Sequence, residues 1–171
     1  MKGAFGTAVL YRKRTDGLLV VLKEININDL NANERQSAIN EVKVLSILNH
    51  QNIISYYNSF ESNGDVYIEM EYADAGTLSE FLSRLSAPLN EYEILLIFRQ
   101  IVCAISYLHS NNILHRDIKT DNIFLNKEGY IKLGDFGISK MLNTKREAES
   151  VVGTPYYISP EIVIKFFNID F

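Results

Sequence analysis

The chain of 171 residues contains only one cysteine, Cys103, and that residue lies in an apolar helical pattern. A lone cysteine of this kind is typical of a reduced thiol in an intracellular protein, and we expect Cys103 to be buried. The chain also lacks a basic stripe, and its formal net charge of −4 argues against nucleic acid as a partner. No uninterrupted apolar run reaches the roughly 18 residues of a membrane span, and the N-terminus lacks a signal-peptide pattern, so we expect no membrane partner.

The residues that are present have the composition of an ordinary globular domain, 47% apolar and 22% charged, without internal repeats or low-complexity linkers. The length suits one domain or a fragment of a larger one. Periodicity predicts strands over 3–12, 18–27, 53–60, 65–72, 123–125 and 130–133, and helices over 32–48, 77–85 and 91–109. The stretch SNGD between the strands over 53–60 and 65–72 is a strong hairpin signal. On the last helix, apolar residues recur at helical spacing, namely Ile94, Phe98, Ile101, Ile105 and Leu108. This order indicates an α+β fold with two lobes that join near residues 72–76.

A lysine and a glutamate in otherwise apolar segments form the first candidate pair. On the helix expected over 32–48, Glu41 shares one face with apolar residues. A carboxylate on a buried face is costly unless it is paired, and Lys23 stands alone in the apolar strand LLVVLKEI. Read singly, each residue is an ordinary exposed charge. Read together, each supplies the partner that the other's burial requires, and the lysine can then hold phosphate oxygens.

Two glycines in the stretch GAFG, Gly3 and Gly6, form the second candidate. In a tight turn they let backbone N–H groups approach phosphate oxygens closely, although a plain β-turn accounts for the same pattern. Gly6 and Lys23 are 17 residues apart, so the turn and the lysine can meet over one phosphate chain.

The stretch ILHRDIKTDNIF, residues 113–124, places charged and amide side chains between apolar residues. Asp117 can take a proton from a nucleophile or orient it, and Lys119 is a fixed positive charge where a phosphoryl group would pass. Asn122 offers an uncharged oxygen ligand to a hard cation. Asp135 follows in LGDFG, 18 residues after Asp117. Each piece alone is common, but HRDxKxxN followed at this distance by DFG is highly specific.

With these residues the chain resembles the eukaryotic protein kinases over residues 1–161. The resemblance implies a bilobal α+β fold. Residues 1–73 would form a five-stranded N lobe with its αC helix, and 74–161 a partial, mostly helical C lobe. It also implies ATP and Mg²⁺ as cofactors and transfer of the γ-phosphate to protein substrates.

The resemblance gives each matched residue an expected role. Asp117 and Lys119 would be catalytic, and Asn122 and Asp135 would hold Mg²⁺. The residues expected to bind ATP are Gly3, Ala4, Phe5, Gly6, Ala8, Val21, Lys23, Glu41, Met70, Glu71, Ala73 and Phe124. Among them Met70 resembles the gatekeeper, and the backbones of Glu71 and Ala73 would contact adenine. A regulatory spine would stack Leu45, Tyr56, His115 and Phe136.

The subclass follows from three motifs. HRDIKTDN with Lys119 resembles serine/threonine kinases, and Thr154 in GTPYY stands where such kinases position the substrate beside the catalytic Asp and Lys. HRDIKTDNIFL, LGDFGISK and VVGTPYYISPE resemble the NIMA-related kinases. Ser150 holds the position that this family phosphorylates in the activation loop, although an ordinary loop serine is the alternative, and Thr144 is a weaker second candidate.

The resemblance to NIMA-related kinases also implies partners and a location. The partners would be protein substrates with Ser or Thr, and an upstream kinase or a second copy of the chain. The location would be intracellular and cytoplasmic, at a centrosome, microtubule or cilium.

The sequence departs from the family pattern at three places. Ala8 replaces a usual valine and Val21 a usual alanine near the expected nucleotide site. The tail 162–171, IVIKFFNIDF, is unlike the αF helix with which family members continue and on which the helix over 91–109 packs. We therefore expect an apolar patch to be exposed on that helix, and interpret the tail as intron read-through or a mis-annotated gene end.

Two readings of function remain. The first is an active Ser/Thr kinase, of which residues 1–171 alone are weakly active or inactive. The second is a catalytically incompetent fragment that binds nucleotide or the partners of its parent. A small-molecule phosphotransferase is disfavoured because GTPYYISPE serves to position a peptide.

Overall fold

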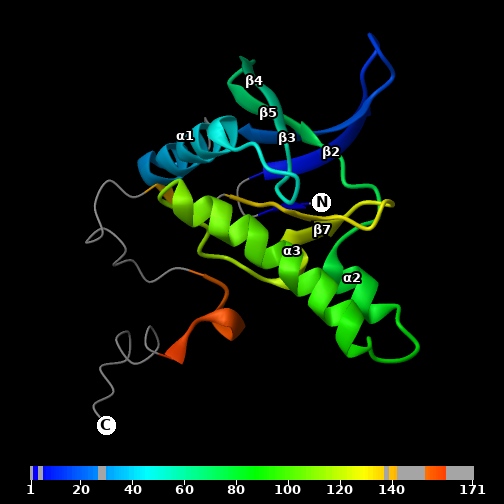
Figure 1. Ribbon diagram of the computed structural model, residues 1–171. Coiled ribbons are helices and arrows are strands. Elements are labelled where there is room, and N and C mark those ends of the chain that lie inside the picture. The colour runs from blue at the N-terminus through cyan, green and yellow to red at the C-terminus, as the bar shows by residue number, and fades with distance from the viewer. Residues whose placement is uncertain (1, 4–5, 27–29, 137–138, 142–152, 161–171) are drawn as a thin grey trace.

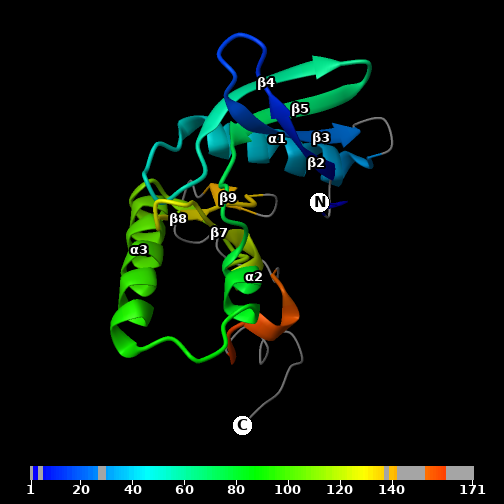
Figure 2. The ribbon, with the colours of Figure 1, turned by 90° about the vertical axis from the view of Figure 1, so that its right-hand side faces the viewer.

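A five-stranded antiparallel sheet forms the N-terminal lobe of the computed structural model, which describes residues 2–3, 6–26, 30–136, 139–141 and 153–160 (Figure 1). Its strands lie in the order β1-β2-β3-β5-β4. The bounds are β1 Lys2–Gly3, β2 Gly6–Arg12, β3 Leu19–Asn26, β4 Tyr56–Ser62 and β5 Asp65–Glu71. The helix α1, Ala32–Ile47, follows β3 and packs against this sheet (Figure 2).

The second lobe is built from two helices and short antiparallel strand pairs. Its elements are α2 Leu78–Ser83, α3 Glu91–Ser110, β6 Ile113–Leu114, η1 Thr120–Asn122, β7 Ile123–Leu125, β8 Ile131–Leu133, β9 Lys140–Met141 and η3 Pro155–Tyr157. β7 pairs with β8, and β6 pairs with β9. Figure 2 shows the sheet and α1 in the upper part of the molecule, with β7, β8, α2 and α3 below them. The two-lobed α+β architecture predicted from the sequence is confirmed.

Turn chemistry sets the register of the β4–β5 hairpin. Ser62 pairs with Asp65, and the two residues between them have positive φ, 54° at Asn63 and 83° at Gly64. Two successive positive φ angles match the right-handed twist of the strands, and asparagine followed by glycine adopts them at the least cost. The hairpin signal in the sequence is therefore confirmed.

One apolar core runs through both lobes. Ile25 and Ile68 come from the sheet and Val44 from α1, whereas Leu108 comes from α3 and Leu133 from β8, and all five are almost completely buried. The face of α1 predicted to be buried is buried, including Glu41. This shared core fixes the position of each lobe relative to the other.

The strand predicted over 53–60 begins three residues later, at Tyr56. Ile53 and Ile54 are buried, but their partner is β8 of the other lobe rather than the sheet. The N–H of Ile54 donates to the Leu133 carbonyl at 2.9 Å, and Ile53 forms a parallel bridge with Leu133. The predicted strand is therefore shorter than expected, and Ile53 and Ile54 join the lobes.

The prediction that Cys103 is buried is wrong, because its side chain is exposed. Two apolar faces run along α3, and the inner face, with Ala104 and Leu108 at its centre, packs on the lobe. Cys103 lies on the outer face, where Ile94 and Phe98, which the periodicity grouped with the inner residues, are also exposed. The expected exposed patch on this helix is confirmed; its large apolar side chains are Tyr92, Ile94, Leu95, Leu96, Phe98 and Val102.

The same two faces give α3 the length and mean hydropathy, 1.3, of a membrane span. The expectation from the sequence counted only uninterrupted apolar runs, and the absence of a membrane partner stays a prediction. Length and composition are the whole of this similarity, and helices of globular domains can have both. α3 contacts β6 and β8 of its own lobe.

The two faces of α3 predict different costs for the same substitution. Leu108→Ala should lower the free energy of unfolding by about 2–5 kcal/mol, because Leu108 is 1% exposed and its loss leaves a cavity. Leu95→Ala is the matched control, since Leu95 is 54% exposed on the same helix and should cost less than about 0.5 kcal/mol. Urea unfolding followed by circular dichroism measures both, and equal losses would contradict the assignment of the two faces.

Candidate active site

The lysine and glutamate paired from the sequence are in contact. Lys23 lies near the centre of β3, and its Nζ is 2.6 Å from Oε1 of Glu41 on α1. The Glu41 side chain is 2% exposed, and this burial raises its pKa, although the charge of Lys23 opposes the shift. The contact fixes α1 against the sheet.

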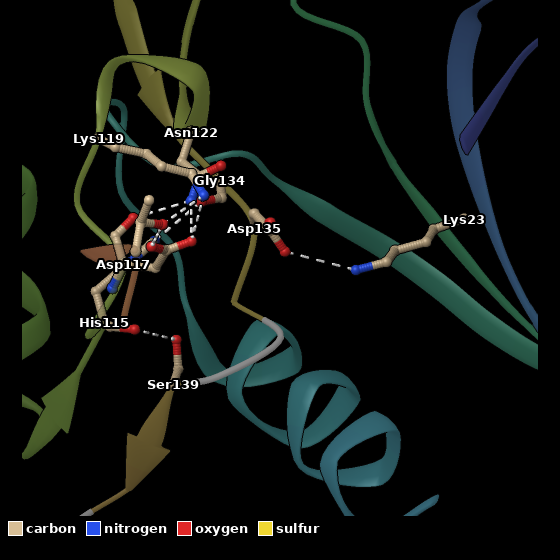
Figure 3. Close-up of polar contacts among 9 residues, drawn as sticks. Lys23, His115, Asp117, Lys119, Asn122, Gly134, Asp135 and Ser139 are labelled. Atoms are coloured by element: carbon tan, nitrogen blue, oxygen red, sulfur yellow. Dashed lines mark hydrogen bonds and ion pairs between the residues drawn. The ribbon is translucent and has the colours of Figure 1, made fainter. Parts of the chain in front are cut away.

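Asp135 approaches the same lysine from the other lobe. Its carboxylate is 3.7 Å from Lys23 Nζ (Figure 3). This ammonium group therefore contacts one carboxylate from each lobe. Asp135 lies two residues after the end of β8 and has a φ of 59°. Few residues with a side chain adopt this left-handed conformation, although aspartate and asparagine tolerate it best. The Asp135 side chain is 46% exposed, so its carboxylate faces solvent rather than the core.

Three polar side chains converge on the carboxylate of Asp117, which lies between β6 and η1. Asn122 Nδ2 donates to its Oδ2 at 2.9 Å, and Lys119 Nζ lies 2.9 Å from the same oxygen. The hydroxyl of Thr154, 37 residues later in the chain, donates to Oδ1 and accepts from Lys119 Nζ at 2.8 Å. Figure 3 shows Asp135 between this cluster and Lys23.

The charge state of Asp117 follows from these contacts. Partial burial would raise the pKa of its carboxyl group, but the hydrogen bonds from Thr154, Lys119 and Asn122 together outweigh burial and lower it. Asp117 is therefore an anion at neutral pH. A carboxylate held in this way orients a hydroxyl donor more effectively than it removes a proton in the ground state.

His115 holds the backbone that carries Asp117. Its Nε2 is 2.9 Å from the carbonyl of Gly134, and its Nδ1 accepts the N–H of Asp117 at 3.3 Å. Because Nδ1 accepts, the ring is neutral with its proton on Nε2, and burial lowers its pKa. The ring also contacts Phe136, with centroids 4.9 Å apart. Phe136 and Leu45 belong to the same core, against which Tyr56 packs, so the four predicted spine residues occupy one region.

The predicted Mg²⁺ ligands, Asn122 and Asp135, are neighbours. Gly134 N–H donates to the Asn122 carbonyl at 2.9 Å, which places the residue before Asp135 beside Asn122. The Asn122 amide nitrogen makes both contacts with Asp117, to its backbone and side-chain oxygens, so the amide oxygen is oriented away from that carboxylate. An exposed carboxylate and an amide oxygen are hard donors, and the pair fits a hard divalent cation.

The predicted ATP-binding residues within the described ranges come from α1, from four strands of the sheet, from the segment after β5 and from β7. Gly3 pairs with Gly6, Ala8 with Lys23, and Val21 with Met70 within the sheet. Glu71 ends β5, Ala73 is buried, and Phe124 lies on β7. A side chain at Gly134 would meet the Phe124 ring at 2.8 Å, so glycine there gives this ring its room. The predicted residues Ala4, Phe5 and Ser150 lie outside the described residues, as do Thr144 and the tail 162–171.

Asn52 is a buried polar residue that was not predicted from the sequence. Asn52 is 1% exposed; its side chain donates to Gln100 on α3 and to the Ile131 carbonyl, and its own carbonyl accepts from Leu133 N–H at 2.8 Å. It fixes the segment before β4 to β8. The signal was an amide residue directly before the apolar pair Ile53–Ile54, which reads equally well as an exposed loop residue.

Comparison with known proteins gives matches along nearly the whole chain. The family model described as the protein kinase domain matches residues 2–168. The chain is 52% identical over 169 residues to the probable serine/threonine-protein kinase nek3 of Dictyostelium discoideum, 49% identical to the serine/threonine-protein kinase Nek9 of Mus musculus, and 50% identical to Nek8 of Danio rerio. The alignments cover 94–95% of this chain but only 15–23% of those proteins.

The neutral state of His115 predicts a pH dependence of stability. Because the folded-state pKa lies below the ordinary value of 6.5, the unfolded chain binds the proton more readily, and stability falls as pH drops below about 6.5. The loss is at most about 1.4 kcal/mol per pH unit for one proton. His115→Gln, which keeps a donor toward Gly134, should flatten the dependence measured by urea unfolding between about pH 7.5 and 5.5.

The control for this measurement is His109→Gln on the exposed end of α3, which should retain the wild-type slope. His50 also has a pKa lowered by burial and contributes to the total slope, so the difference between wild type and each variant is the quantity to compare. Identical slopes for His115→Gln and wild type would contradict the neutral state assigned to His115 in the folded protein.

Proposed function

The chain belongs to the protein kinase domain family and is similar to its NIMA-related members, and from this premise we propose that the protein containing it is a serine/threonine kinase. It would transfer the γ-phosphate of ATP to serine or threonine hydroxyls of protein substrates. The observation that carries this proposal is the anionic carboxylate of Asp117, held by Lys119, Asn122 and Thr154.

The roles of the charged residues follow from their positions. Asp117 would orient the substrate hydroxyl toward the phosphoryl group, and Lys119 would offset negative charge on that group during transfer. Lys23, held by Glu41, would bind phosphate oxygens of ATP. Asn122 and Asp135 would hold Mg²⁺, which, when bound, offsets the charge of the phosphates.

The polypeptide substrate would lie against Thr154. Its hydroxyl contacts both Asp117 and Lys119, so the segment that contains GTPYY is joined directly to the group that orients the acceptor hydroxyl. This contact favours a peptide acceptor over a small molecule. The ATP site would lie between the glycine turn at Gly3–Gly6, the hinge residues Glu71 and Ala73, and Phe124.

Regulation, partners and location are proposed from the family. We place activating phosphorylation at Ser150, by an upstream kinase or by a second copy of the protein. The protein would be intracellular, with a centrosome, microtubule or cilium as its site of action. The chain spans less than a quarter of the length of the relatives compared above, so these proposals concern the whole protein.

Asp117→Asn should lower γ-phosphate transfer to casein by about 100- to 10,000-fold, because an amide cannot accept and orient the hydroxyl proton as the carboxylate does. Asp121→Asn, four residues away on the exposed side of the same loop, is the matched control and should retain activity. Radiolabelled ATP measures transfer by the full-length protein and by residues 1–171. Equal activity of the Asp117→Asn variant and wild type would exclude the assigned role, and a folded wild type without transfer would favour a non-catalytic module.

Ser150→Ala should lower the activity of the full-length protein by about tenfold or more, because a phosphate at this position can form charge-assisted hydrogen bonds that order the segment. Phosphopeptide mass spectrometry of the active protein should find phosphate on Ser150. Unchanged activity of the alanine variant would exclude Ser150 as the activating site.

A further inference from the structure

A second charged pair, between β5 and β8, joins the two lobes. Lys132 in the middle of β8 contacts both carboxylate oxygens of Glu71, the last residue of β5, at 2.8 and 3.0 Å. The side chains are only 12% and 19% exposed. The N–H of Ser55 donates to Glu71 Oε2 at 3.0 Å, and the N–H of Glu71 donates to the Ser55 carbonyl at 2.9 Å. The carboxylate is thus held from two sides.

Each partner belongs to an element that lines the proposed nucleotide site. Glu71 ends the strand that leads into the hinge, and its backbone is the expected contact for adenine. Lys132 lies directly opposite Phe124 in the β7–β8 pair, and β8 leads within three residues to Asp135. The ion pair therefore connects the hinge with the hairpin below the sheet (Figure 2).

Geometry rather than stability is the main contribution of a pair of this kind. Removal of two charges from water costs much of what their attraction returns, so a mostly buried pair adds little net stability. Both oxygens of the Glu71 carboxylate contact the Lys132 ammonium group, and one of them also accepts the N–H of Ser55. These three contacts fix the position of the carboxylate. The position of the hinge relative to β8 is then fixed as well.

We propose that the Glu71–Lys132 ion pair sets the separation between the hinge and the β7–β8 hairpin and thereby the width of the adenine site. Both residues are positioning residues, because they act through the hinge backbone and Phe124. The inference rests on the proposed function, since it requires a nucleotide between the hinge and Phe124.

A second ion pair on the same strand provides the control. Glu69 lies two residues before Glu71 on β5, and its Oε1 is 2.7 Å from Nζ of Lys13, with side chains 34% and 13% exposed for Lys13 and Glu69. Lys13 directly follows β2, so this pair stays within the N-terminal lobe. Loss of the Lys13–Glu69 pair should therefore alter contacts within the N-terminal lobe but not the separation of the two lobes.

The experiment measures binding of Mg·ADP by calorimetry, and KM for ATP and kcat, in the full-length protein. Lys132→Met should raise the Kd for ADP and the KM for ATP about 3- to 10-fold and leave kcat within about twofold. Lys132→Arg keeps the charge and should bind ADP within twofold of wild type. Lys13→Met removes the control pair and should leave both constants unchanged.

A double-mutant cycle tests whether the two residues act as one unit. Glu71→Gln, nearly isosteric with the wild type, should weaken ADP binding as Lys132→Met does, and the double variant should be no weaker than either single variant. Additive losses would overturn the proposal. If Lys132→Met does not fold, Glu71→Gln with Glu69→Gln as its control carries the same test.

The outcomes separate this inference from the proposed function. If the wild-type protein binds ADP and the Lys132→Met and Glu71→Gln variants bind it with the same Kd, the inference is overturned and the proposed function stands. A decrease in kcat without a change in Kd or KM would overturn it as well, because a wider adenine site alters nucleotide affinity first. A folded wild type that neither binds ADP nor transfers phosphate would overturn the proposed function together with the inference.

Discussion

The 2.6 Å contact between Lys23 and Glu41 fixes α1 against the sheet and holds a positive charge within 3.7 Å of Asp135 in the second lobe. Glu41 is almost completely buried, and a buried carboxylate without a partner would be too costly to retain. The position of the helix and that of the lysine therefore depend on each other. Asp135 then approaches the same lysine from the second lobe, so one ammonium group organises carboxylates from both.

The second lobe meets the same constraint around Asp117. Its carboxylate is satisfied by Lys119, Asn122 and Thr154, and its backbone N–H by His115. His115 in turn binds the carbonyl of Gly134, the residue before Asp135. The residues proposed to orient the substrate and to hold the metal thus share one hydrogen-bonded frame. Positive φ angles at Arg116 and Asp135 are part of this frame, and the surrounding contacts hold both conformations.

Contacts between the lobes complete the arrangement without taking part in the proposed chemistry. Ile54 and Asn52 fix the segment before β4 to β8 through backbone hydrogen bonds, and Glu71 reaches the same strand through Lys132. β8 is therefore one of the elements to which the N-terminal lobe is attached, and it ends two residues before Asp135. A change in the attachment of β8 alters the position of the proposed metal ligand relative to the hinge.

The sequence by itself determined the features that short patterns encode. The periodicity of α1 placed Glu41 on a buried face, Asn63–Gly64 predicted the hairpin turn, and the spacing from Asp117 to Asp135 indicated the catalytic set. Only the tertiary structure decided which distant residues meet: Thr154 at Asp117, Ile54 at β8 and Lys132 at Glu71. It also decided that Cys103 lies on the exposed side of α3, because periodicity shows that a helix has apolar faces but not which of them the rest of the chain covers. Local patterns depend on backbone geometry within a few residues, whereas these contacts depend on how the two lobes pack.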